Sequence, residues 1–164
     1  DVNEMVETIK EKDREMGLCR NAAGYAWKWA SKKDKTAYDI EIQGHKYRWN
    51  STYKNWIASE NSVNEIGCIH TSQGLEFDYV GVIIGDDMRF EDDHIVTDFT
   101  KRAKTDQSLK GIKKLYKENP EFALKEADEI IKNTYRTLMT RGMKGCYVYC
   151  TDKKLAEYLK KCLE

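Results

Sequence analysis

One stretch of the chain has the residue types that binding chemistry needs: "CIHTSQGLEFDYVGVIIG", in which polar side chains interrupt two apolar runs. His70 carries an imidazole, Thr71 a hydroxyl and Gln73 an amide, while Glu76 adds a carboxylate. Gly74 lets a backbone approach a ligand closely. If the apolar runs are parallel strands, the polar residues follow the carboxyl end of the first, where α/β proteins bind ligands. An ordinary polar turn accounts for the same residues about equally well.

A second stretch, "TYRTLMTRGMKG", places two arginines near the end of an expected helix. Arg136 and Arg141 are five positions apart, which is about 140° around a helix, so they cannot share one narrow face. Arg141 lies next to Gly142, where a cation suits the negative end of the helix dipole. The sharper interpretation is that Arg141 binds phosphate, because its planar guanidinium matches phosphate oxygens bidentately.

Together these stretches resemble a known family. "IHTSQGLEFDYVGVIIG" is similar to motif V of superfamily 1 helicases, and "YRTLMTRG" is similar to their motif VI. With "AGYAWKW" and "GCYVYCTD", the chain more closely resembles the Schlafen-group-3-like DNA/RNA helicases, a bacterial P-loop ATPase family, over roughly residues 18–152. The resemblance implies the second RecA-like domain of such an enzyme. We therefore expect residues 1–164 to form a single domain, a fragment of a longer ATPase.

The resemblance also implies roles on the nucleic-acid side. His70 and Thr71 would contact the backbone of a DNA or RNA single strand. Gln73 would line the junction between the strand and the nucleotide, together with Gly74.

On the nucleotide side, Gly74 and Glu76 would adjoin ATP, with Glu76 bonding the ribose or positioning the cleft between domains. Arg141 would be the catalytic arginine finger on the γ-phosphate. Arg136 stands where some relatives place an aromatic residue, so it is only a secondary candidate. Arg20 is a further candidate phosphate contact.

The more important departure from the family is an absence, since the chain has neither a GxxxxGK[ST] phosphate loop nor an acidic Walker B strand. These parts bind the phosphates and Mg²⁺ in phosphoryl transfer. We therefore expect ATP and Mg²⁺ to act in the intact protein, with an N-terminal RecA-like domain of the same chain as partner. This fragment alone is expected neither to bind them nor to hydrolyse ATP.

The elements that position these residues follow from composition and periodicity. The chain has 164 residues, enough for one domain, with 28 basic and 28 acidic side chains and zero formal net charge. The neutral balance gives no whole-chain signal for nucleic acid, although a local groove can still be basic. Five cysteines without a CxxC pair argue against a disulfide framework or a zinc site and favour a reducing, cytoplasmic compartment. No apolar run is long enough to span a membrane.

Strands alternating with helices predict an α/β fold, a three-layer RecA-like (P-loop NTPase-like) domain with a mainly parallel sheet and a hairpin insertion. The predicted strands are residues 18–30 with their alternating aromatics, a hairpin over 38–50 turning at Gln43-Gly44, an extended piece around Trp56, 65–70, 79–85, 94–99 and 145–151. The predicted helices are residues 1–17, 108–118, 121–141 stopped by Gly142, and 152–164 capped by Asp152.

Two other functions stay open. The domain could be a non-catalytic nucleic-acid-binding or regulatory module with a helicase-like fold. A nucleotide-dependent nuclease fits less well, because no convergent carboxylates with metal spacing occur, and we predict no metal site. The aromatic residues of the first third, interleaved with lysines, could stack on bases. Their alternation is more typical of a core.

Overall fold

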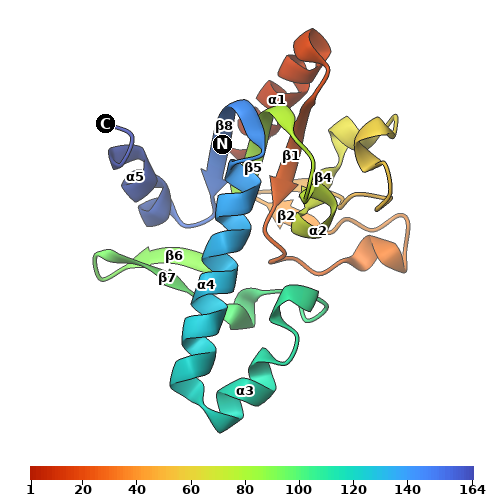
Figure 1. Cartoon of the computed structure of the whole chain (residues 1–164). Coiled ribbons are helices and arrows are strands. Elements are labelled where there is room, and N and C mark those ends of the chain that lie inside the picture. The colour runs from red at the N-terminus through yellow and green to blue at the C-terminus, as the bar shows by residue number, and fades with distance from the viewer.

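The computed structural model describes all 164 residues and has a four-stranded parallel sheet at its centre (Figure 1). The strands occur in the order β4-β1-β5-β8, and each neighbouring pair is parallel. Their bounds are β1 (Cys19–Ala23), β4 (Ile66–Cys68), β5 (Phe77–Ile84) and β8 (Gly142–Cys150). The expected α/β fold with a mainly parallel sheet is confirmed.

Helices cover both faces of this sheet, which gives three layers. Helix α1 (Val2–Met16) packs on one face, and helix α4 (Pro120–Met139) packs on the other. Strand β5 serves both layers: Val82 lies in the core that contains the α4 residues, and Ile83 lies in the core that contains the α1 residues. A strand buried on both faces needs a nearly continuous apolar sequence, which β5 has.

The helix ends follow the capping chemistry that the sequence predicts, with one exception. Gly17 ends α1 in the left-handed region at φ 86°, and Asp152 caps α5 (Lys153–Lys161) by accepting from two backbone amides. Gly142 was expected to stop α4, and this is wrong. The helix ends at Met139, and Gly142 already begins β8, paired with Phe77.

Two hairpins flank the sheet. The predicted hairpin forms from β2 (Ile40–Ile42) and β3 (His45–Tyr47), and both of its turn residues have positive φ, as a tight two-residue turn requires. The second hairpin joins β6 (Met88–Glu91) to β7 (His94–Thr97). The sequence predicts only the second of these strands. Residues 88–91 were not recognised as a strand because the segment is polar and leads into the two aspartates of the turn.

Two predicted extended segments are not strands. Residues 24–29 leave the sheet after Ala23, because Gly24 packs directly against the ring of Tyr135. The alternating aromatic residues that follow therefore belong to a loop and not to a strand. The piece around Trp56 is a 3-10 helix, η2 (Trp56–Ala58), with the indole buried.

Strand β8 is also more exposed than its sequence predicts, because it lies at the edge of the sheet. Cys150 at its end is buried, but Cys146 is exposed.

The remaining elements are short. Helix α2 (Ile69–Ser72) follows β4, and α3 (Ile112–Glu118) lies beside the first half of α4 below the sheet in Figure 1. The other 3-10 helices are η1 (Ala30–Lys32), η3 (Ser62–Asn64), η4 (Phe99–Lys101) and η5 (Gln107–Leu109). None of the helices combines the length and apolar character that a membrane crossing requires.

Candidate functional site

The segment between β4 and β5 runs from the carboxyl edge of the sheet, where the parallel strands end, back to the amino edge, where they begin. Helix α2 begins directly after Cys68, which is level with Ala23 at the carboxyl edge. The chain then returns to Phe77, which starts β5 at the opposite, amino edge. We expected everything from Thr71 to Glu76 to lie at the carboxyl edge, and this is wrong: parallel strands force the chain to cross back between them.

His70 is the exposed polar residue of α2 at the carboxyl edge. Its Nε2 lies 3.6 Å from Oδ1 of Asp106, and its ring meets the edge of Tyr25 at a centroid distance of 6.4 Å. Thr71 beside it is buried, with its hydroxyl 3.2 Å from the thiol sulfur of Cys68. Of these two candidates, only His70 presents its side chain to a ligand.

The next three candidates are exposed along the return to the amino edge. Gln73 and Glu76 hold their side chains in solvent, while Gly74 has φ 80° with open space around it. The backbone amide of Phe77 donates to the carbonyl of Arg141 at 2.8 Å. Glu76 is therefore one residue from a backbone contact that joins this segment to Arg141.

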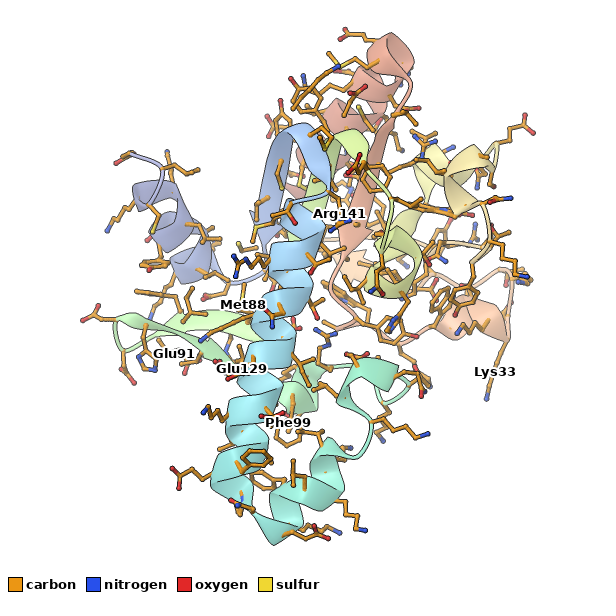
Figure 2. All side chains as sticks on the ribbon, in the orientation of Figure 1. Lys33, Met88, Glu91, Phe99, Glu129 and Arg141 are labelled. Atoms are coloured by element: carbon orange, nitrogen blue, oxygen red, sulfur yellow. The ribbon has the colours of Figure 1, made fainter.

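Arg141 lies just beyond the end of α4 and is half-buried (Figure 2). Its Nε donates to the carbonyl of Thr137 at 3.2 Å, and its two terminal nitrogens have no hydrogen-bond partner in the protein. The hydroxyl of Thr140 donates to the same Thr137 carbonyl and to that of Arg136. Thr140 thus closes the helix end, and the guanidinium is anchored at Nε with its outer edge free to bind an anion.

The two secondary arginine candidates differ from Arg141. Arg136 is exposed and its side chain makes no hydrogen bond. Arg20 is buried, and its guanidinium donates to Asp13 at 2.6 Å, to Ser62 at 3.0 Å and to the carbonyls of Cys19 and Ile57. These bonds give Arg20 a structural role between α1, β1 and the η2–η3 segment.

A buried charged network lies beneath the carboxyl edge, and sequence reasoning missed it. Arg102 donates to Asp106 through Nε at 2.8 Å and to Asp87 through Nη1 at 3.1 Å. The hydroxyl of Tyr135 on α4 donates to the other oxygen of Asp87 and accepts from the amide of Gly85. The sequence contains one signal for this network, which is the acidic pair Asp86-Asp87 directly after the strongest predicted strand. The rest of the network was missed because residues 86–107 show no periodicity.

Burial and charge act in opposite directions within this network. Burial raises the pKa of Asp87, and Arg102 and Tyr135 offset it only in part. Burial also disfavours the charged form of Asp106, but Arg102 and two hydrogen bonds from Ser108 outweigh it and leave the pKa lowered. Burial raises the pKa of Tyr135 well above its usual range, so its hydroxyl stays protonated and can donate.

The network connects the two sets of candidates. Asp106 faces His70 at one end, and Tyr135 holds Asp87 at the other. Tyr135 and Arg141 belong to α4 and its end, so a continuous series of contacts runs from the exposed imidazole to the helix that carries the exposed guanidinium. The structure brings together no group of three or more His, Cys, Asp or Glu side chains that could hold a metal ion.

Comparisons with known proteins show the family to which the chain belongs. Residues 1–152 match the family model described as "Schlafen group 3, DNA/RNA helicase domain". The "Uncharacterized protein YPL245W" of Saccharomyces cerevisiae is 32% identical over 165 residues, covering 97% of this chain and 35% of that protein. The chain thus spans about a third of the length of this relative, which is a eukaryotic protein, so the similarity is not confined to bacteria. No solved structure matches.

Proposed function

From the premise that this chain belongs to the Schlafen group 3 DNA/RNA helicase domain family, we propose that it is the second RecA-like domain of an ATP-dependent helicase or translocase. ATP would lie between this domain and an N-terminal RecA-like domain that supplies the phosphate loop and the Mg²⁺ ligands. These 164 residues contain no such loop, and the yeast relative is nearly three times as long as the matched region. We place the intact protein in the cytoplasm.

On the nucleotide side, Arg141 is the arginine finger. The bond from its Nε to Thr137 fixes the plane of the guanidinium, so its two terminal nitrogens can donate together to γ-phosphate oxygens. These donors stabilise the negative charge that spreads over the phosphoryl group in the transition state. Glu76 and Gly74 lie on the segment bonded to Arg141 through Phe77, which suits a contact with the ribose.

On the nucleic-acid side, His70 contacts the backbone of a DNA or RNA single strand. It is exposed at the carboxyl edge, and Asp106 lies 3.6 Å from its Nε2, which orients the ring at the surface. Thr71 supports this position from within, and Gln73 follows on the exposed return segment.

The observation that carries the proposal is the buried network between His70 and Tyr135. A motor must relate occupancy of the strand site to the geometry of the nucleotide site, and this requires an element that both sites bias. Helix α4 is the element that we propose for this role, because Tyr135 ties it to the network and Arg141 at its end bonds the Thr137 carbonyl.

The test uses the full-length protein that carries this domain. Arg141→Ala is expected to lower kcat for ATP hydrolysis by roughly 10³-fold, while binding of single strands stays at the wild-type level. Arg136→Ala, an exposed arginine on the same helix, serves as the control and should keep normal turnover. Near-normal turnover in Arg141→Ala, with strand binding intact, would favour a non-catalytic nucleic-acid-binding module instead.

A further inference from the structure

A cavity of about 290 Å³ opens beside His70 at the carboxyl edge of the sheet. Buried Tyr25 and Trp29 line it together with Thr105 and the exposed side chains of Lys32, Tyr53, His70 and Gln107. We call this cavity the aromatic pocket. It combines flat apolar surface, a cation and an amide within one small volume.

The buried rings of the aromatic pocket are held rigidly. Tyr25 stacks on buried Trp49 with ring centroids 5.5 Å apart, and its hydroxyl lies 3.1 Å from that of Thr105. Trp29 packs against Tyr53 at 5.5 Å. Tyr53 nevertheless remains 55% exposed, so the pocket presents an aromatic ring that is partly open to solvent.

A cation lies directly over these rings. The Lys32 ammonium is 4.1 Å from the centre of the Trp29 ring and 5.2 Å from that of Tyr53. Such contacts hold the ammonium beside the aromatic faces without neutralising its charge. The pocket therefore suits a ligand that is planar and carries a negative charge next to the planar group.

We propose that the aromatic pocket binds one unpaired base of the single strand. The base stacks on Tyr53, the Lys32 ammonium pairs with the adjacent phosphate, and the Gln107 amide contacts the edge of the base. Stacking platforms combined with cations are how single strands are bound without sequence preference. The inference rests on the proposed function, because the strand path that passes His70 also passes this pocket.

Charge decides against the other ligand that aromatic pockets commonly take, which is a methylated ammonium group. Lys32 already places a positive charge over the rings, and a second cation would be repelled. A base with its phosphate has the opposite charge and the matching shape.

The experiment compares two strands of equal length on the full-length protein, a short oligothymidylate and the same sugar–phosphate chain without bases, by fluorescence anisotropy. Wild type should bind the base-containing strand about ten-fold more tightly, as expected for one stacked base. Tyr53→Ala should reduce this ratio to near one and leave affinity for the abasic strand unchanged. Tyr53→Trp should preserve the ratio.

Matched controls come from the same region. Tyr38 is 51% exposed and lies outside the pocket, so Tyr38→Ala should behave as wild type. Lys32→Gln should reduce the salt dependence of strand binding by about one released ion. Lys33→Gln should not, because Lys33 is exposed at the periphery of the same segment (Figure 2) and does not line the pocket. An oligouridylate arm distinguishes RNA from DNA, and either result supports the pocket.

Several outcomes would overturn the inference. A Tyr53→Ala protein that still discriminates the two strands would show that the pocket holds no base. A trimethyl-lysine peptide whose binding depends on Tyr53, with strand binding independent of it, would assign the pocket to a protein partner. If these failures occur while Arg141→Ala still abolishes strand-stimulated turnover, only the pocket is refuted. If wild type binds no strand, the proposed function fails with it.

Discussion

The hydroxyl of Tyr135 donates a hydrogen bond to the carboxylate of Asp87, and the side chains of both residues are buried. Tyr135 belongs to the long helix α4, whereas Asp87 follows the central strand β5. The bond therefore ties the outer layer of the domain to the carboxyl edge of the sheet at the point where the charged network begins.

Removing this hydroxyl should destabilise the fold measurably. Tyr135→Phe leaves one oxygen of Asp87 without its donor and the amide of Gly85 without its acceptor. We expect a loss of about 1–3 kcal/mol in the free energy of unfolding, measured by urea titration. Tyr116→Phe, on an exposed ring, is the control and should change little. A loss equal to that of the control would mean that the network contributes nothing to stability.

The network also predicts a pH dependence with a definite sign. The pKa of Asp106 is lowered in the fold, so its contribution to stability is present above the ordinary carboxyl pKa of about 3.9. That contribution is lost as the pH falls through the lower folded value. Asp106→Asn should destabilise by about 3 kcal/mol at neutral pH, since it removes one partner of a buried ion pair. The difference from wild type should shrink as the pH falls below about 4.

Asp87 should show the opposite behaviour. Its folded pKa is raised by burial, so the proton that it binds in the fold stabilises the protein at low pH, and this stability is lost as the pH rises towards the folded pKa. Stability titrations of wild type, Asp87→Asn, Asp106→Asn and the exposed control Glu118→Gln would separate the two effects. A difference between wild type and Asp106→Asn that does not change with pH would contradict the assignment.

Close packing at Gly24 should make this position intolerant of any side chain. A Cβ there would overlap the ring of Tyr135, which is fully buried and cannot move aside. We expect Gly24→Ala to destabilise by about 3 kcal/mol. Gly44→Ala is the comparison, because its Cβ would meet open space and only the positive φ of 83° is unfavourable, which costs about 1 kcal/mol. Equal losses at the two positions would refute the packing argument.

Lysine should not replace Arg141. Lys keeps the charge but has neither the Nε that bonds Thr137 nor the two parallel donors. In the full-length protein, Arg141→Lys should therefore lower kcat nearly as much as Arg141→Ala, whereas Arg136→Lys should leave it unchanged. Steady-state ATPase assays decide this, and recovery of turnover by lysine would reduce the role of Arg141 to that of a simple positive charge.

The 164-residue chain alone should bind ATP weakly or not at all. One guanidinium and one carboxylate approach the nucleotide from a single side, and the phosphate loop that cradles it is missing from this sequence. Calorimetry with ATP and Mg²⁺ on the isolated chain tests this expectation. An affinity in the micromolar range would show that the domain has a nucleotide site of its own.

Local sequence predicted those parts of the fold in which one strong pattern dominates. The run of apolar residues in β5, the cap at Gly17 and the turn at Gln43-Gly44 each depend on a few neighbouring residues, and all three are confirmed. Residues 24–29 were misread because their alternation imitates a strand, while tertiary contact with Tyr135 takes the chain out of the sheet.

The candidate site, like the fold, was predicted from the sequence only in part. Motif order along the chain pointed to His70 and Arg141, and the structure places both where a ligand can reach them. Motif order could not show that Thr71 is buried, because helix α2 replaces the expected end of the strand. The pairing of Arg102 with Asp87 spans 15 positions of irregular chain, which no periodicity encodes.

The order of the strands has a consequence for how the domain assembles in time. Asn21 pairs with Ile66, Cys19 with Tyr79 and Phe77 with Gly142, which are partners 45, 60 and 65 positions apart. Every pairing in the central sheet therefore closes a long loop, and such topologies fold in milliseconds to seconds rather than microseconds. Of the strands in this sheet, β8 is synthesised last, directly after Arg141. A nascent chain thus acquires His70, which we propose to contact the nucleic acid, before it acquires Arg141, which we propose to act on ATP.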